Sequence, residues 1–486
     1  MTIGNEQKGT GHTDRLVDLA LGTRYSDIPR DVAHDTKRVI LDTIGCSVAG
    51  FATDAGRILV EVKRGLGGRE DATLMVHGGK LPVTTISYIH AQLGNALDLD
   101  ETLIHRTHYA NSIVMPALAM AEMTGASGQE MIAAVALGFD IGARVGFSMP
   151  QYETTPEGIV HFVPVMGFSW AVFGTVATAG RLLGLSHQQM ANALSIAYVS
   201  TPVHHQGRWR KLPGATGGGR PMHKYAMYGA IAEAGINAVL LAAEGFTGDP
   251  LILDSNRAFW TAFSSFPADW DYMVRDLGQH WFISETSLKF YPAGRQASIP
   301  VDLFLKMIQK EGLSADEIEE VTVTVPPAHV AMGLYDNTSL PSQLGPMPIP
   351  IAFAIAALGI ESGLQWVSHE TLRRPEIRAF ALKVKSAVNQ DWYSIIVDQV
   401  KAEGTYRRIP TEVEIKARGT SFKAFAEYAR GDPWGPEPMT DEDLAYKFGN
   451  YTSDLIGRAN ADRAITEGFN LEAAPDVRKL VSALHR

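Results

Sequence analysis

Apolar residues in the first half of the chain recur at intervals that fit one side of a helix. In the segment 31–51, for example, Val32, Val39 and Ile40 fall on a common face. Small residues are frequent in these segments, which lets neighbouring helices approach closely. The same spacing predicts further helices at Ile86–Leu99, Val114–Met123, Gln129–Phe147, Ala171–Leu185, Gln188–Tyr198 and Met227–Gly245. The first part of the chain is therefore predicted to be all-helical.

The pattern changes after about Ser284. Residues 319–325 alternate between polar and apolar with a period of two and stop at Pro326, which is typical of a strand. Residues 411–417 repeat the alternation, and Arg418-Gly419 with the polar–aromatic return that follows predicts a hairpin. Helical runs between the strands are expected at Ile299–Glu311, Ile349–Leu358 and Pro375–Val388. This part of the chain is predicted to form a smaller α+β domain.

The last segment, 441–485, returns to an amphipathic helical pattern and is expected to pack back on the first part. We therefore predict a mainly α fold in which a large all-helical domain, 1–283, is completed by a C-terminal return, 431–486. The smaller α+β lid domain, 284–430, is predicted to be inserted between these two pieces. A cleft between the domains is the expected ligand site.

The composition is that of an ordinary globular protein, with 486 residues, of which 45% are apolar and 20% charged. The net charge of −10 argues against a nucleic-acid-binding protein. The uncharged stretch 162–180 approaches the ~20 residues that a membrane span needs, but Pro164 and several Gly and Ser residues favour an interior helix. Because the N-terminus does not resemble a signal peptide, a cytoplasmic location without a membrane partner is expected.

Cys46 is the only cysteine of the chain. One thiol excludes intramolecular disulfides, CxxC redox chemistry and zinc sites built from several thiolates. It also excludes an iron–sulfur cluster held by cysteines. Because Cys46 lies within an apolar helical pattern, we interpret it as a packing residue.

A cluster of acidic residues and histidines separates two of the apolar segments. Asp98, Asp100, Glu101, His105 and His108 fall within residues 98–108. One interpretation is a charged loop between two helices. A second is a metal site, since histidines and carboxylates together can hold zinc. A third is an acid–base site, in which a carboxylate fixes the tautomer of a histidine at the mouth of a pocket.

The segment 158–232 contains no Asp or Glu, although it is rich in cationic side chains and histidines. This composition favours binding of a multiply anionic ligand, because a nearby carboxylate would neutralise the site. Glycines at 214 and 217–219 allow a ligand to approach the backbone closely, but no phosphate-binding or dinucleotide-binding glycine motif is present. The alternative is a solvated basic loop. The cations and histidines are Arg181, Arg208, Arg210, Lys211, Arg220, Lys224, His161, His187, His204, His205 and His223.

Lys289 lies before Phe290-Tyr291-Pro292, at the predicted junction of the two domains. A lysine beside aromatic residues is ordinarily a surface residue whose stem covers apolar groups. Its placement where the cleft is expected favours contact with a ligand. Tyr335, in the loop after the first predicted strand, is unremarkable by itself.

Several short motifs, taken in order, resemble successive signatures of the MmgE/PrpD family. They are Leu41–Cys46, Asp98–Thr102 with His108, Arg220–His223 and Lys289–Ala293. The similarity runs from about Asp14 to the C-terminus, and the ordered set is more specific than any single motif. The family includes 2-methylcitrate dehydratase, cis-aconitate decarboxylase and iminodisuccinate epimerase. The resemblance implies a helical domain with an inserted α+β lid, a homodimer, and chemistry without a cofactor or a metal.

The resemblance also assigns roles to individual residues. Asp98, Thr102 and His108 match the acidic–histidine loop of the family, Lys289 matches the lysine of the lid junction, and Tyr335 resembles a lid tyrosine. His108, oriented by Asp98, is the expected proton-transfer group, and Tyr335 the expected donor to the substrate or leaving group. His105 is expected to be a replaceable neighbour.

Other positions depart from the family pattern. Arg220 stands where many members have a lysine, so the positive charge is kept but is carried by a planar guanidinium instead of an ammonium group. Lys224 is a second candidate for the same substrate-binding role. Val165 occupies a position where many members have a histidine, and His161, one helical turn away, is the expected substitute. The alternative is that this role is missing from the chain. The departures are Tyr109 in place of a common proline, and Val165 and Gly294 in place of histidines.

Proton abstraction beside a carboxylate is the chemistry that the resemblance implies. The enolate-like charge that develops must be spread over cationic donors in a dry cleft, for which Arg220, Lys289 and Arg208 or Lys224 are the candidates. The expected function is a hydro-lyase acting on a 2-methylcitrate-like tricarboxylate. Epimerisation of a substituted succinate, decarboxylation of cis-aconitate and non-catalytic binding of a polycarboxylate are the alternatives.

Overall fold

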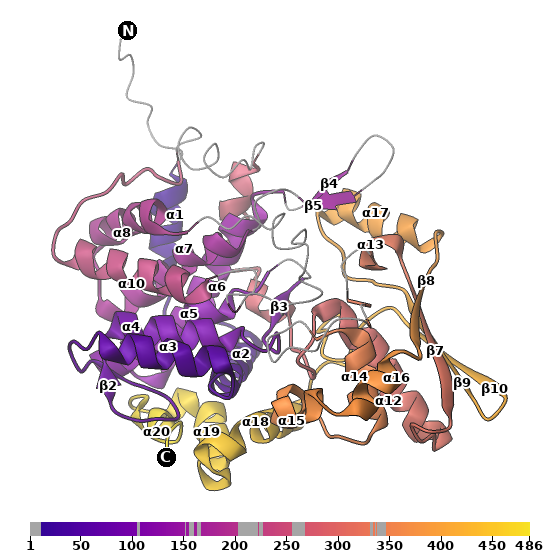
Figure 1. Ribbon diagram of the computed structural model, residues 1–486. Coiled ribbons are helices and arrows are strands. Elements are labelled where there is room, and N and C mark those ends of the chain that lie inside the picture. The colour runs from indigo at the N-terminus through magenta and orange to yellow at the C-terminus, as the bar shows by residue number, and fades with distance from the viewer. Residues whose placement is uncertain are drawn as a thin grey trace.

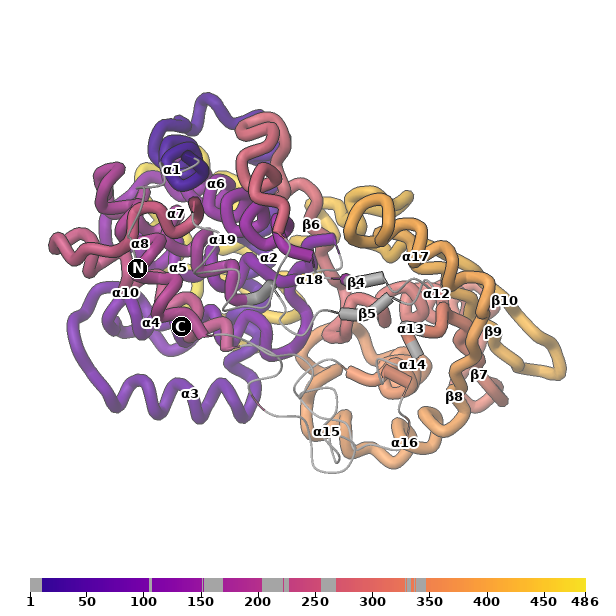
Figure 2. The backbone as a smooth tube through the Cα atoms, turned by 90° about the horizontal axis from the view of Figure 1, so that it is seen from above, coloured from indigo at the N-terminus to yellow at the C-terminus, as the bar shows by residue number. Residues whose placement is uncertain are grey.

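The computed structural model of this chain describes residues 11–104, 107–150, 152–154, 160–162, 167–202, 222, 227–254, 268–330, 334–335, 337 and 347–486. Within these residues the protein is mainly α-helical, as predicted. Two bodies lie side by side, one built from the first helices together with the C-terminal helices, and the other carrying the largest sheet of the described residues (Figure 1). The view from above shows the same division (Figure 2).

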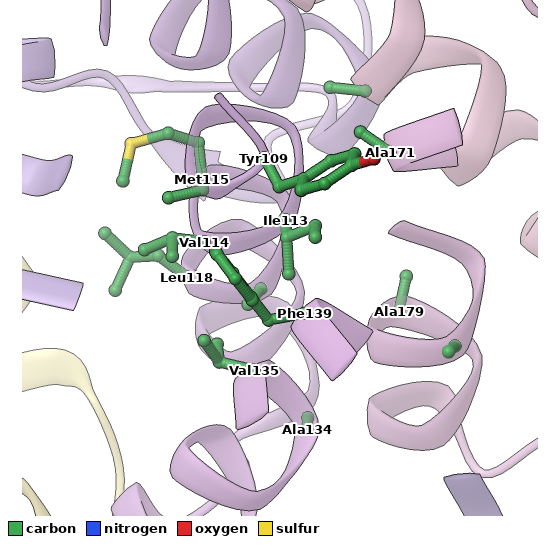
Figure 3. Packing of buried hydrophobic residues seen from close by; sticks show 14 of the residues in the cluster. Tyr109, Ile113, Val114, Met115, Leu118, Ala134, Val135, Phe139, Ala171 and Ala179 are labelled. Carbon is green, nitrogen blue, oxygen red and sulfur yellow. The ribbon is translucent and has the colours of Figure 1, made fainter. Parts of the chain in front are cut away.

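Long helices of the first part bury their apolar faces against one another. Tyr109 and Phe139 pack edge to face with ring centroids 6.1 Å apart, beside Ile113 (Figure 3). A Cβ atom at Gly138 would lie 2.6 Å from the carbonyl oxygen of Gly174, so glycine is needed where these two helices cross. The elements are α1 (His12–Gly22), η1 (Tyr25–Asp27), α2 (Arg30–Gly50), α3 (Asp54–Gly65), α4 (Val83–Gly94), α5 (Ala110–Thr124), α6 (Gly128–Phe147), η2 (Gly167–Trp170), α7 (Ala171–Leu183), α8 (His187–Ser200), α10 (Tyr228–Ala243), η3 (Trp270–Val274) and η4 (Phe282–Glu285).

The second part is built around a four-stranded sheet with the order β10-β9-β7-β8. The predicted hairpin is present, because Thr420 pairs with Ala417 across a turn at Arg418 and Gly419, whose φ values are 55° and 69°. The elements are α12 (Arg295–Glu311), β7 (Ile318–Val325), α13 (Pro327–Val330), α14 (Ile349–Ala357), η5 (Leu364–Val367), α15 (His369–Leu372), α16 (Pro375–Ala381), β8 (Val384–Val388), α17 (Trp392–Glu403), β9 (Thr411–Ala417) and β10 (Thr420–Ala426).

One prediction for this part is wrong in its second half. The segment 375–388 was expected to be a single helix, but α16 ends at Ala381 and β8 follows as a strand parallel to β7. As an edge strand, β8 leaves Lys385 and Ser386 exposed and buries Val384. The strand is stabilised by backbone pairing with β7, and its side chains do not alternate clearly between polar and apolar, so the sequence pattern did not predict it.

The C-terminal segment packs back on the first part, as its amphipathic pattern predicted. Both α18 and α19 lie against α2. The described core forms two clusters, one drawn from residues 16–288 and 439–484, and the other mainly from residues 291–429. The boundaries at 284 and 430 stay a prediction. The elements are α18 (Asp441–Ile456), α19 (Arg458–Phe469), η6 (Leu471–Ala473) and α20 (Arg478–Ser482).

Residues 167–180, from the stretch that matched a membrane span in length, form η2 and the start of α7, which are packed in the first core cluster. In the described part of the chain, no helix combines the length and apolar character that crossing a membrane requires. Short strand pairs complete the fold: β1 (Ala72–Thr73) with β2 (Lys80–Leu81), β3 (Thr102–Leu103) with β6 (Thr286–Ser287), and β4 (Tyr152–Thr154) with β5 (Val160–Phe162).

Candidate active site

The pairing of β3 with β6 brings together the two motifs that the sequence placed almost 200 residues apart. Thr102 is the register partner of Ser287, so the acidic loop, described at residues 95–104 and 107–108, lies against the segment that carries Lys289. Within these described residues, two that are not glycine have positive φ values, 55° at Asp98 and 44° at Ile104. Such backbone strain persists only where the surroundings hold it, and it is concentrated at functional sites. Here the Ile104 carbonyl accepts a 2.9 Å hydrogen bond from Thr405 Oγ1.

Lys289 and Asp98 form an ion pair at the centre of this contact. Lys289 Nζ lies 2.9 Å from Asp98 Oδ1 and donates to the Asp98 carbonyl oxygen at 2.5 Å. Both side chains are buried. The sequence analysis assigned Asp98 to orient His108 and Lys289 to hold a substrate carboxylate. The structure instead pairs the two residues with each other, because the loop turns the Asp98 carboxylate toward β6.

His108 is fixed by the same loop but through other residues. Its Nδ1 contacts the Glu101 carbonyl oxygen and lies 3.2 Å from Asp100 Oδ2. A carbonyl oxygen can only accept a hydrogen bond, so Nδ1 carries a proton and Nε2 is the nitrogen that can accept one. The carboxylate that supports His108 Nδ1 is therefore Asp100, which the sequence analysis had not assigned to this role.

Asp100 is held by two amide side chains from the ends of neighbouring helices. Asn95 Nδ2 donates to both carboxylate oxygens, at 3.0 and 2.8 Å, and Asn111 Nδ2 donates to Oδ2 at 2.5 Å. A Cβ atom at Gly94 would lie 1.9 Å from Asn111 Oδ1, so this position requires glycine. The amide donors stabilise the ionised form of Asp100 and fix it beside His108.

Glu101 is the third polar side chain of the loop. Its Oε1 accepts a 2.8 Å hydrogen bond from the Ala110 backbone nitrogen at the start of α5, and among the described residues Oε2 has no partner. Burial, together with the charge of Asp100, raises the pKa of Glu101 from 4.5 to about 8. At neutral pH this side chain therefore holds a proton and adds no second negative charge next to Asp100.

Asp100, Glu101 and His108 also have the composition of a metal site. One ligand atom of each lies within 4.8 Å of the others. The Nδ1 contact of His108 does not decide between the metal and the acid–base alternatives, because its deprotonated Nε2 could accept either a proton or a metal ion. The Asp100 oxygens, in turn, already accept from the two asparagine amides.

A second buried lysine, Lys447, holds the backbone of the acidic loop. Lys447 Nζ in α18 donates to Asp42 Oδ1 at 2.5 Å and to the Leu99 carbonyl oxygen at 3.0 Å. The adjacent carbonyls of Asp98 and Leu99 are thus held by Lys289 and Lys447. Asp42 belongs to the first of the motifs, which gives that motif a structural role. Burial raises the pKa of Cys46, so its thiol stays neutral and fits the predicted packing role.

The remaining predicted site residues are placed only in part. Thr102 is buried, and its Oγ1 has no partner within the described residues. Tyr335 packs against the second core cluster, and burial raises the pKa of its phenol. His161 lies in the strand β5 opposite Glu153, so the helical spacing that the sequence analysis assumed for it is wrong. His105, Arg208, Arg220, Lys224 and Val165 lie outside the described part of the chain.

Asn95, Asn111 and Lys447 contribute to this site and were missed by the sequence analysis. The two asparagines flank the acidic segment at the ends of the observed helices α4 and α5, and their closeness to that segment in the sequence could have drawn attention to them. Lys447 gives no local signal, because it comes from the C-terminal return and is one of many lysines on amphipathic helices.

Comparison with known proteins agrees with this arrangement of motifs. Residues 14–271 match the MmgE/PrpD N-terminal domain, and residues 291–471 match the MmgE/PrpD C-terminal domain. Cis-aconitate decarboxylase from Mus musculus is 23% identical over 490 residues, covering 97% of this chain and 93% of the relative. The protein of the same name from Aspergillus terreus is 23% identical over 501 residues, covering 98% and 96%. The two domain matches span most of the chain, and it belongs to the MmgE/PrpD family.

Proposed function

We propose that this protein is a lyase acting on a small tricarboxylate of the cis-aconitate type. The observation that carries the proposal is the buried His108, whose Nδ1 is fixed by Asp100 and the Glu101 carbonyl, and we assign proton transfer to its Nε2. The names of the full-length relatives support decarboxylation of cis-aconitate. This alternative therefore moves ahead of the dehydration of 2-methylcitrate that the sequence analysis placed first.

Decarboxylation and dehydration place similar demands on the site. In decarboxylation of cis-aconitate, the bond to the departing carboxylate breaks and its electron pair forms a new double bond. The original double bond shifts, leaving negative charge on a carbon beside another carboxylate, and that carbon then takes one proton. In dehydration a proton is first removed from such a carbon and hydroxide leaves. Both routes need one proton-transfer group and a dry cationic environment for the developing charge.

His108 Nε2 is the proposed proton carrier for either route. The contacts of Nδ1 with Asp100 and the Glu101 carbonyl oxygen fix the orientation of the imidazole ring for this transfer. Burial of the acidic loop strengthens these electrostatic interactions by excluding water. Tyr335, Arg220, Lys224, Arg208 and His161 are kept as proposed partners of the substrate. We further propose that the chemistry needs no cofactor and that the protein is a homodimer.

The test is turnover of three substrates in deuterated water, followed by NMR. With cis-aconitate, release of carbon dioxide and one deuterium on the carbon next to a carboxylate is the expected result. Loss of water from 2-methylcitrate would favour the dehydratase, and deuterium exchange in a substituted succinate without loss of any group would favour an epimerase. Binding of these acids without any exchange would contradict the proposal and indicate a non-catalytic protein.

A further inference from the structure

The ammonium group of Lys289 has no donor left for a ligand in this conformation. An ammonium group has three N–H bonds. Lys289 Nζ faces the Asp98 carbonyl oxygen at 2.5 Å, Asp98 Oδ1 at 2.9 Å and the Ala293 carbonyl oxygen at 3.4 Å. A substrate carboxylate could bind Lys289 only by displacing one of these protein oxygens. Lys289 in this conformation therefore does not anchor the substrate, and the other buried cation of the same segment is a candidate for that role.

Arg295, six residues further on, is buried but only partly paired. Its side chain is 3% exposed, and Nη2 contacts Asp432 Oδ1. Nε and Nη1 of Arg295 have no hydrogen-bond partner among the described residues. Burial lowers the pKa of Arg295 to about 9, so the guanidinium is still charged at neutral pH. Buried N–H groups on a charged side chain are rarely left without an acceptor.

The surroundings of Arg295 also suit an anion. Arg295 is the first residue of α12, a helix of 17 residues whose N-terminal end attracts negative charge. Ser298, three residues along on the same side of the helix, is buried, and its Oγ has no partner within the residues that the structure describes. Two unsatisfied side chains and the helix N-terminus thus occur together.

Asp432 connects Arg295 to the acidic loop. Ser287 Oγ also contacts Asp432 Oδ1, and Ser287 is the register partner of Thr102. The alternate residues Thr286 and Leu288 line a separate surface pocket beside α2. Arg295 therefore lies on the Ser287 side of this segment, the side whose next alternate residue, Lys289, pairs with Asp98.

We propose that Arg295 and Ser298 form a carboxylate-binding subsite for the substrate. The inference rests on the proposed function and deepens it, because a third carboxylate anchor distinguishes a tricarboxylate from a dicarboxylate. In this arrangement Asp432 holds the guanidinium in place through Nη2, and Nε and Nη1 donate to the carboxylate. Thr102, the register partner of Ser287, lies six residues before His108 in the chain.

Calorimetric titration with two unreactive probes tests the subsite. Tricarballylate has three carboxylates on a saturated chain, and glutarate lacks the central one. Replacing Arg295 alone would leave the Asp432 carboxylate buried and unpaired, so the variant to use is Arg295→Met combined with Asp432→Asn. Arg295→Lys keeps the charge, Ser298→Ala removes the hydroxyl, and Arg57→Met removes an exposed arginine as the control.

The double variant is expected to bind tricarballylate about 10- to 100-fold more weakly than the wild type, as for loss of a charged hydrogen bond. Ser298→Ala is expected to lose about 3- to 10-fold, Arg295→Lys less than the double variant, and Arg57→Met nothing. Unchanged glutarate affinity would assign the subsite to the central carboxylate, and an equal loss for glutarate would assign it to a terminal one. A folded double variant that binds tricarballylate like the wild type would overturn the subsite alone. A wild type that binds neither probe would overturn the proposed function and the subsite with it.

Discussion

The acidic loop and the start of α12 approach the same strand pair, β3 and β6, but their polar groups are satisfied to different degrees. In the loop, both aspartate carboxylates have partners, because Asp100 accepts from Asn95 and Asn111 and Asp98 accepts from Lys289. At the start of α12, the cation itself is incompletely paired, because Arg295 Nε and Nη1, with Ser298 Oγ, have no partner among the described residues. Charged groups satisfied by the protein hold the geometry, whereas a buried charged group with unpaired N–H bonds needs an explanation, which for Arg295 we propose to be a ligand.

The difference in pairing suggests different roles for Lys289 and Arg295, the two cations in the segment 289–295. Both are buried, and sequence alone would rank Lys289 above Arg295 because it belongs to a family motif. Lys289 has an acceptor for each of its N–H bonds, so its first role is to hold the strained Asp98 turn. Arg295 shares Asp432 with Ser287 and retains unpaired N–H groups. The following predictions test this division.

The largest effect is expected at His108. His108→Ala should lower kcat by ~10²–10⁴-fold while leaving substrate affinity largely intact, because a proton-transfer group acts on the chemical step. Steady-state kinetics and direct calorimetric binding on the folded variant measure the two quantities separately. His105→Ala is the matched control, with near-normal kcat expected. Near-normal turnover of His108→Ala would remove His108 from the mechanism and move attention to His161, His204 or His205.

Replacing Lys289 is expected to lower the unfolding free energy of the protein more than it weakens substrate binding. Lys289→Met leaves the Asp98 carboxylate buried without its cation, which typically destabilises a protein by about 3–5 kcal/mol. Urea unfolding measures the change in free energy, with Lys310→Met, at an exposed lysine, as the control. Combining Lys289→Met with Asp98→Asn should recover part of the loss. A stable Lys289→Met variant with weakened tricarballylate binding would instead restore Lys289 as a substrate anchor.

Glu101 predicts a pH dependence of stability with a definite sign. The folded protein keeps the Glu101 proton up to about pH 8, whereas in the unfolded chain the group ionises near 4.5. The folded state therefore binds more protons between these values, and the unfolding free energy of the wild type should fall as pH rises. The slope relative to Glu101→Gln should reach at most about 1.4 kcal/mol per pH unit.

Chemical denaturation at a series of pH values measures this difference. Glu70→Gln, at an exposed position, serves as the control and should follow the wild type. If the wild-type and Glu101→Gln curves run parallel between pH 4.5 and 8, Glu101 is ionised in the folded protein and the pKa assignment is wrong.

The smallest effect is expected from metal removal. Exhaustive chelation should leave turnover unchanged, because the Asp100 oxygens already accept hydrogen bonds from the Asn95 and Asn111 amides. The measurement is kcat before and after chelation and dialysis. Loss of activity that one specific divalent ion restores would make Asp100, Glu101 and His108 a metal site and would contradict the acid–base assignment.

Much of the fold was predictable because its signals are local. The apolar spacing of 31–51 fits α2, and the alternation of 411–417 with the turn at Arg418-Gly419 fits the β9–β10 hairpin. The sequence failed at β8, where a short segment became a strand only by pairing with β7. Local pattern carries no information about a partner strand that lies more than 60 residues away.

For the candidate site, the sequence by itself determined which residue types are available: one cysteine, an acidic loop with His108, and a lysine at Lys289. Only the tertiary structure decided their partners, giving Asp98 to Lys289 and Asp100 to His108. The reason is the backbone turn at Asp98, whose φ is 55°, and this turn is held by Lys289, which follows β6, and by Lys447 of α18. The sequence specifies which side chains are present, but the direction in which each carboxylate points is set by long-range contacts that a local sequence pattern does not reveal.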